Sequence, residues 1–338
     1  MNKKNRVLII AEAGVNHNGS IRKAKKLIDI AENSGADIVK FQTFDPKELV
    51  TVNAQKPIYQ KKNTSKNQTQ YQMLRKLTLS QKMHKELFKY AKSKKIEFLS
   101  TAFDAKSLKM LIKLGIKRIK IPSGEITNLP LLKFIAKQKL PVILSTGMSN
   151  IREVNEALKI LTKFGKSKSQ ITVLHCTSDY PAAIGDINLK AMQTLQKSLN
   201  LSVGYSDHSL GKDVAIAAVA LGAKIIEKHF TISKKLYGPD HKASLEPKEL
   251  ELFVRSVRNI EIALGNGKKI ATKNENKNKV YTRRSIVAIK GIQKGELFNY
   301  NNIGVKRPGK GISPMNIDKI IGKKSKYNFI ADQEIKIK

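Results

Sequence analysis

Between residue 7 and about residue 265, short β-branched apolar runs alternate with stretches of helical periodicity. A parallel strand that helices cover on its outer face reads as a continuous apolar run. Eight such units fit the roughly 250 residues of a (β/α)8 barrel, so we predict an α/β fold with a TIM barrel. An open doubly wound sheet is the second interpretation, but no Gly-rich phosphate-binding fingerprint follows any run. The runs are Val7–Ala13, Ala36–Gln42, Ile96–Ala102, Arg118–Pro122, Val142–Thr146, Ile171–Thr177, Leu201–Ser206 and Lys224–Phe230.

Two of the intervening stretches predict helices in detail. Asn150 and Glu153 have the spacing of a capping box. Behind them, one helical face carries Val154, Ala157, Leu158 and Leu161. A second apolar stripe is ended by Gly222 and comprises Val214, Ala217, Ala218 and Leu221. Both stripes have the spacing that a helix needs to cover a sheet.

The composition changes after Gly265 and predicts a second domain. We predict a catalytic barrel over residues 1–267, a charged linker over 268–281 and a small, mainly β domain over 282–338. A domain of about 55 residues is marginally stable alone, so we expect it to dock on something.

One polar insertion, Asp45–Thr69, interrupts the alternation of apolar runs and helical stretches in the barrel. A loop of that length after the second strand is more often functional than decorative.

The formal net charge of +37, from 64 basic and 27 acidic residues, bears on the class of partner. Such a charge promotes nonspecific binding to nucleic acid. Only ten of the basic residues are Arg, however, and the Lys residues are scattered along the chain. No zinc finger, RNP motif or basic arm is present. We therefore expect a cleft that attracts anionic substrates and no specific nucleic-acid site. A nucleic-acid-binding protein is kept as the alternative from another class.

The location of the protein follows from what the sequence lacks. It has no apolar run of about 18 residues, which a membrane span requires, and no secretory segment. Its single cysteine, Cys176, lies in an apolar run. One cysteine excludes an internal disulfide and fits a reducing compartment. We predict a cytoplasmic protein with no membrane contact, in which Cys176 is a small buried thiol.

Polar groups stand at the ends of all eight apolar runs, where a barrel enzyme carries its active site. Fixed positive charge and hydroxyl donors suit a phosphate and a carboxylate, and Lys40, Lys120, Thr101, Ser123 and Ser145 supply them. Glu125 and Asp240 suit a polyhydroxylated partner. An anionic phosphate ester and a sugar-like carbonyl in one mouth indicate carbon–carbon bond formation. The strand-end residues are Glu12, Lys40, Gln42, Thr101, Lys120, Ser123, Glu125, Ser145, Thr177, Tyr180, Asp207, His208, Lys228 and His229.

Two histidines end neighbouring runs and predict a metal site. His208 and His229 are separated by one βα unit, so in a barrel they point into the same mouth. Neutral imidazoles in this arrangement are natural ligands for a divalent transition metal that polarises a carbonyl. A metal-dependent hydrolase on the same fold is a further alternative, but it needs more carboxylate ligands. Of the other histidines, we expect His17 and His241 to lie on active-site loops and His84 to lie on the surface.

Several motifs together resemble the sialic acid synthase family over nearly the whole chain. They include the segments at residues 11–19, 39–44, 120–125, 144–148, 238–241 and 306–309. The C-terminal part resembles the antifreeze-like (SAF) domain of that family. Two segments depart from the family pattern, Ser100–Asp104 and Thr177–Ala183. The second lies near the acceptor and puts the identity of the acceptor in doubt.

The resemblance implies a phosphoenolpyruvate-dependent synthase that makes a nine-carbon 2-keto acid. It implies that C3 of phosphoenolpyruvate attacks an aldehyde, that water adds at C2, and that phosphate leaves by C–O cleavage. The acceptor is expected to be N-acetylmannosamine, giving N-acetylneuraminate. The alternative acceptor is 2,4-diacetamido-2,4,6-trideoxymannose, giving N,N′-diacetyllegionaminate.

The resemblance also implies roles for individual residues. Phosphoenolpyruvate is expected on Lys40, Thr101, Lys120, Ser123 and Ser145, and Glu12 is expected to act as general acid/base or to orient water. His208 and His229 are expected to bind the metal, Mn²⁺ first and Mg²⁺ or Co²⁺ as options. Glu125, Tyr180, Asp240 and Arg307 are expected to face the acceptor. Arg307 would come from the partner subunit of a domain-swapped homodimer.

Overall fold

The computed structural model describes residues 6–65 and 67–337. The chain divides into two compact units, Met1–Gly265 and Asn266–Lys338. No helix in the described part of the chain is long and apolar enough to cross a membrane.

The first unit is built on a curled sheet of eight parallel strands in the described chain, in the order β3-β2-β1-β8-β7-β6-β5-β4. β1 pairs with both β2 and β8, and β3 lies beside β4 without a ladder, which nearly closes the barrel. The predicted barrel is therefore confirmed, and each predicted run overlaps one strand. The strands are β1 (Leu8–Gly14), β2 (Ile38–Thr43), β3 (Glu97–Ala102), β4 (Ile119–Ile121), β5 (Val142–Ser145), β6 (Ile171–Cys176), β7 (Ser202–Asp207) and β8 (Ile225–His229).

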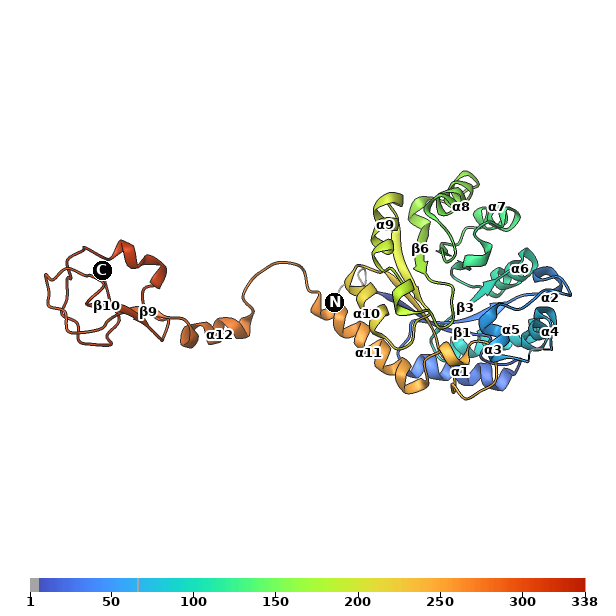
Figure 1. The fold of residues 1–338 in the computed structure, drawn as a ribbon, viewed down its shortest axis with the longest axis horizontal. Helices are drawn as coiled ribbons and strands as arrows, with labels where there is room; N and C mark the ends of the chain where they lie inside the picture. Colours follow the sequence, from blue (N-terminus) through green and yellow to red (C-terminus); the bar gives the residue numbers. More distant parts are fainter. Residues whose placement is uncertain (1–5, 66, 338) are drawn as a thin grey trace. The chain divides into compact units, whose positions relative to one another are not determined.

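Helices surround the strands, as Figure 1 shows. Their apolar faces and the outward-facing strand residues form the main core of the unit. The stripe predicted for α8 is confirmed, because its buried residues are the four named above and Asn150 forms the capping box with Glu153. The helices are α1 (Ile21–Asn33), α5 (Gln81–Ser93), α6 (Ala105–Leu114), α7 (Leu129–Ala136), α8 (Ile151–Lys163), α9 (Lys190–Leu199), α10 (Asp213–Ala220) and α11 (Pro247–Ala263).

The face predicted for α10 is confirmed in part, since Ala218 is buried and Leu221 packs against the core, whereas Ala217 is exposed. The buried residues of α10 are Ala215, Ala218 and Val219. Val214 is only partly buried against the core. The helix is apolar over nearly all of its length, so periodicity could not choose a face.

A small apolar layer fills the barrel beneath its C-terminal mouth. Because side chains alternate along a strand, each residue of this layer stands two positions before a residue that faces the mouth. The sequence therefore places an apolar floor directly under the strand-end groups. The pairs are Ile10 and Glu12, Ile38 and Lys40, Leu99 and Thr101, Ile143 and Ser145, Leu174 and Cys176, and Ile225 and Glu227.

Gly204 occupies the corresponding position of β7, where no side chain fits. A Cβ there would lie 2.4 Å from the carbonyl oxygen of Ile225 and 2.6 Å from Cδ2 of Leu174. We expect Gly204→Ala to lower the free energy of unfolding by about 2–3 kcal/mol, because backbone must move to admit the methyl group. The control is Gly185→Ala, where an added Cβ meets nothing within 4 Å. Urea unfolding of both variants tests this, and equal stabilities would contradict it.

The insertion after β2 is not the plain loop that its polar composition suggests. It contains α2 (Pro46–Leu49) and α3 (Ile58–Asn63) and leads into α4 (Gln70–Leu77). Residue 66 of the insertion lies outside the described residues. Asp45 caps α2, and Thr69 forms a capping box with Gln72 at the start of α4. Local capping thus orders a segment whose composition alone reads as loop.

The second unit has its own small core around β9 (Ser285–Ala288) and β10 (Ile303–Lys306), which pair antiparallel. The core residues are Ile286, Ala288, Ile292, Phe298, Ile303, Ile320, Phe329 and Ile335. The segment predicted as a linker contains helix α12 (Lys273–Thr282), which begins with a capping box between Thr272 and Glu275. No residue of α12 is buried, so this capping box rather than packing marks where the helix begins.

Candidate active site

A cavity of about 530 Å³ opens at the C-terminal ends of the barrel strands. Every barrel residue proposed above for substrate, metal or catalysis lines it. Arg307 is exposed on the second unit. The lining includes Glu12, Lys40, Thr101, Lys120, Ser123, Glu125, Ser145, Tyr180, His208, His229 and Asp240.

Two buried lysines and two buried carboxylates form a connected network on the cavity floor. Lys40 pairs with Glu12, and its Nζ lies 3.6 Å from Glu227. It also donates to Oγ1 of Thr101 at 2.7 Å. Lys120 pairs with Oε1 of Glu227 at 2.7 Å. The network therefore holds two ammonium groups in fixed positions, which suits the phosphate and carboxylate of an anionic substrate.

The two carboxylates of this network have opposite pKa shifts. Burial raises the pKa of Glu12 to about 7, against the lowering effect of Lys40. Burial would also raise the pKa of Glu227, but Lys120 and Lys40 together lower it to about 2. Glu227 is thus a permanent anion, whereas Glu12 exchanges protons near neutral pH. When the pKa values of two neighbouring carboxyl groups differ in this way, one commonly has a structural role and the other transfers protons.

Hydroxyl groups line the side of the cavity formed by β4 to β6. Oγ of Ser123 accepts a hydrogen bond from the backbone N–H of Gly147 at 2.9 Å and lies 3.2 Å from Sγ of Cys176. Oγ of Ser145 is buried without a hydrogen-bond partner in the described part of the protein. An unpaired buried hydroxyl in a cavity that two lysines also line is a natural position for an oxygen atom of a bound ligand.

His208 and His229 face the same space, with ring centroids 5.7 Å apart. Nδ1 of His208 lies 2.6 Å from the carbonyl oxygen of Thr177, so this nitrogen carries the proton and Nε2 keeps its lone pair. Oγ of Ser206 lies 3.4 Å from this Nε2, but its single proton goes to the shorter bond with Glu227 at 3.1 Å, so the lone pair stays available. Burial lowers the pKa of His208 to about 4 and the pKa of His229 well below its usual value. Both rings are therefore neutral.

The histidine pair passes a chemical test for a divalent metal. Nδ1 of His229 is buried and has no hydrogen-bond partner among the residues that the structure describes. A neutral imidazole with a carbonyl on its other nitrogen is the usual form of a metal-bound histidine. Within residues 6–65 and 67–337, no group of three or more His, Cys, Asp or Glu side chains gathers around one point. Two imidazoles thus fit a site whose other positions are open to substrate or water.

Aromatic rings connect the histidines to the outer part of the cavity. The ring of Tyr180 lies 4.2 Å from that of His208 and 5.6 Å from that of His229. On its other side, Tyr59 of α3 lies 4.9 Å from Tyr180. Glu125 accepts a hydrogen bond from the side chain of Asn128 at 2.6 Å. Together with Asp240, these groups form a wall that suits the hydroxyls and apolar carbons of a sugar.

Asp240 gives a pH prediction with an unusual sign. Burial raises its pKa from about 3.8 to about 7, so the folded protein binds this proton more tightly than the unfolded chain does. The contribution of Asp240 to stability therefore falls as pH rises from about 4 to about 7. Between pH 5 and pH 8 the loss amounts to about 2–3 kcal/mol. Asp240→Asn should remove this part of the pH dependence, as measured by urea unfolding at both pH values. An unchanged difference would contradict the prediction.

Sequence reasoning missed Glu227 and Ser206, although they stand two positions before His229 and His208, respectively. The alternation of side chains along β7 and β8 places each of them on the same side as its histidine. Lys228, by contrast, does not line the cavity. Its Nζ pairs with Asp207 at 2.6 Å and donates to the carbonyl of Ser209.

Of the other histidines, His84 was assigned to the wrong environment, whereas His17 and His241 lie on loops as predicted. His84 is 1% exposed, not on the surface, and lies 2.7 Å from Oγ1 of Thr43. His17 and His241 do not line the cavity. His17 accepts a hydrogen bond from the N–H of Gly19, and His241 bonds to Thr231. These rings stabilise the loops that surround the mouth.

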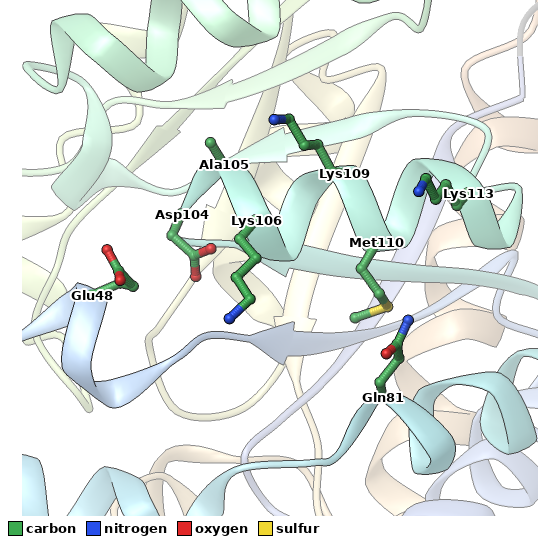
Figure 2. A pocket seen from close by; sticks show the side chains of 8 residues that line it. All are labelled: Glu48, Gln81, Asp104, Ala105, Lys106, Lys109, Met110 and Lys113. Carbon is green, nitrogen blue, oxygen red and sulfur yellow. The ribbon is translucent and has the colours of Figure 1, made fainter.

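A second cavity, of about 540 Å³, lies on the outside of the barrel against α6. Figure 2 shows Lys106, Lys109 and Lys113 along this helix, with Asp104 at its start. The three lysines are exposed, and Asp104 caps the helix through the N–H of Ser107. Without a buried polar group left unpaired, this cavity has no feature of a catalytic site.

Comparisons with known proteins agree with this geometry. The NeuB family model matches residues 27–269, and the SAF domain model matches residues 283–337. The N,N′-diacetyllegionaminic acid synthase of Campylobacter jejuni is 53% identical over 98% of this chain and 99% of its own. The synthase of the same name from Legionella pneumophila is 49% identical over 96% of this chain and 91% of its own.

One solved structure is also similar to this chain in sequence and fold. The N-acetylneuraminic acid (sialic acid) synthetase of Leptospira borgpetersenii, in complex with citrate, superposes with a TM-score of 0.71. It is 36% identical and covers 81% of this chain and 90% of its own.

Proposed function

Since this chain belongs to the NeuB family, we propose that it condenses phosphoenolpyruvate with 2,4-diacetamido-2,4,6-trideoxymannose to give N,N′-diacetyllegionaminate and phosphate. The observation that supports the reaction best is one cavity holding two neutral imidazoles beside two buried lysines. The family resemblance found in the sequence is confirmed.

The proposed acceptor reverses the order of the two acceptors that the sequence analysis predicts. N-acetylmannosamine was the first prediction and the diacetamido sugar the alternative. The two relatives at 53% and 49% identity are both named for the diacetyllegionaminic product, whereas the sialic acid synthetase structure is 36% identical. The alternative is therefore better supported, and N-acetylmannosamine becomes the second candidate.

The residues of the cavity suggest how the reaction proceeds. Lys40 and Lys120 would bind the phosphate and carboxylate of phosphoenolpyruvate, with Thr101, Ser123 and Ser145 as hydroxyl donors. When bound by His208 and His229, a divalent ion would act as a Lewis acid toward the acceptor aldehyde. Mn²⁺ is our first choice, with Mg²⁺ or Co²⁺ as options.

In this scheme C3 of phosphoenolpyruvate forms a bond to the aldehyde carbon. Water then adds at C2, and the C2–O bond to phosphate breaks. Glu12, with a pKa of about 7, can exchange a proton with the adding water or with the new hydroxyl group. Asp240, Glu125 and Tyr180 would hold the remainder of the acceptor.

Rates of phosphate release with the two acceptors test the proposal. We expect kcat/KM with 2,4-diacetamido-2,4,6-trideoxymannose to exceed that with N-acetylmannosamine by about tenfold or more, the usual effect of a few changed polar contacts. Release should require phosphoenolpyruvate, an acceptor and a divalent metal. A preference for N-acetylmannosamine would overturn the acceptor, and release with no acceptor dependence would overturn the reaction.

We also propose a domain-swapped homodimer, which rests on the family resemblance. Arg307 is exposed on the second unit, which leaves its guanidinium free to enter the cavity of a partner subunit. Light scattering gives the oligomeric state. A monomer with full activity would overturn this arrangement.

A further inference from the structure

The cavity has a polar side and an apolar side. Hydroxyl and thiol groups from the loops after β4 to β6 line one part of it. Across the barrel, the insertion between β2 and β3 contributes apolar side chains, which we call the apolar wall. The wall consists of Leu49, Val50, Ile58, Met73, Leu74 and Leu77. An apolar surface of this kind binds the methyl groups of a ligand better than its hydroxyls.

Gln60 is a polar side chain set beside this wall. Its Nε2 donates to the phenol oxygen of Tyr59 at 3.0 Å. Its Oε1 is buried and has no hydrogen-bond partner in the described chain. A buried acceptor without a donor costs free energy of folding, so a ligand that supplies the donor would be bound selectively.

A series of contacts connects Gln60 to the histidine pair. Gln60 is bonded to Tyr59, the ring of Tyr59 lies 4.9 Å from that of Tyr180, and the ring of Tyr180 lies 4.2 Å from that of His208. An acceptor with its aldehyde at the histidines and its other carbons along these rings would extend toward Gln60.

We propose that Gln60 and the apolar wall select the acceptor by binding the acetamido group at C4 of the diacetamido sugar. The inference rests on the proposed function and names the part of the site that chooses between the two acceptors. The acetamido N–H donates to Oε1 of Gln60, and its methyl group packs on the wall. N-acetylmannosamine carries a hydroxyl at C4, which is also a donor, but it has no methyl group on the wall to hold that hydroxyl against Gln60, so water competes for Oε1.

Two substitutions in the cavity test the proposal, each with a matched control on the same insertion. Gln60→Met keeps the length of the side chain and removes both polar atoms. Val50→Thr keeps volume and adds a hydroxyl to the wall. The controls are Gln55→Met and Val52→Thr, at exposed positions outside the cavity lining. Val50→Thr does not touch the bond between Gln60 and Tyr59, so it tests the wall even if Gln60→Met folds poorly.

The measurement is kcat/KM for each acceptor, with KM for phosphoenolpyruvate and the melting temperature alongside. We expect Gln60→Met to lower kcat/KM for the diacetamido sugar about tenfold or more and that for N-acetylmannosamine less than about threefold. Val50→Thr should shift the ratio in the same direction, and both controls should leave it unchanged.

Three results would count against the proposal, and they differ in what they overturn. If the wild type prefers the diacetamido sugar and both cavity variants keep that preference, Gln60 and the wall do not select the acceptor and the proposed function stands. If the wild type prefers N-acetylmannosamine, the proposed acceptor fails and the role of Gln60 fails with it. An equal fall for both acceptors would also overturn the selective role.

Discussion

His229→Ala is expected to lower kcat by about a thousandfold or more while the barrel stays folded, because it removes one of the two imidazoles that we propose as metal ligands. The imidazole is 6% exposed, and its Nδ1 makes no hydrogen bond within the described residues. Because Nδ1 has no partner, removing the imidazole does not leave another described group without a hydrogen bond to that atom. The loss should appear in activity far more than in melting temperature.

His175→Ala is the matched control for this experiment. Its Nε2 bonds to the carbonyl of Ile187 at 2.8 Å, and the side chain does not line the cavity. The control should lose stability and keep activity within about tenfold, because it breaks a structural hydrogen bond only. Isothermal titration with Mn²⁺ should show binding to the control and not to His229→Ala. Full activity of His229→Ala, or of the wild type after chelation, would remove the metal assignment.

Much of this site was predictable because a barrel converts strand position into side-chain position. Once the apolar runs are placed, every second residue points inward and the last one reaches the mouth. Lys40, Lys120 and His229 follow from that rule alone. The positive charge of the two lysines also predicted an anionic substrate, because both lysines stand at the same end of the barrel.

Other features depended on packing and could not be predicted. His84 lies on a helix whose sequence gives it no special signal, yet tertiary contact with Thr43 buries it. The pairing of Lys228 with Asp207 removes both from the mouth, although each stands at a strand end. The insertion reads as loop because its helices are short and depend on capping at residues such as Asp45.

Glu227→Gln is expected to have the second large effect, on stability as well as turnover. Glu227 neutralises Lys120 at 2.7 Å and contributes to the charge balance of Lys40. Without its charge, Lys120 remains buried without its carboxylate partner. Removing one partner of a buried ion pair usually costs about 3–5 kcal/mol of stability. The pKa of Lys120, already lowered by burial, should fall further, because its neighbouring anion is gone.

The bound substrate supplies a specific test of this prediction. Phosphoenolpyruvate and inorganic phosphate bring negative charge to the same lysines, so either should restore part of the lost stability. The rise in melting temperature on adding phosphate should be larger for Glu227→Gln than for the wild type. Glu97→Gln is the control, since it breaks the pair with Arg118 outside the active-site cavity. It should cost less stability than Glu227→Gln and leave the phosphate effect unchanged. If both variants respond to phosphate alike, the lysine network does not form the anion site, and the positions of Lys40 and Lys120 must have another cause.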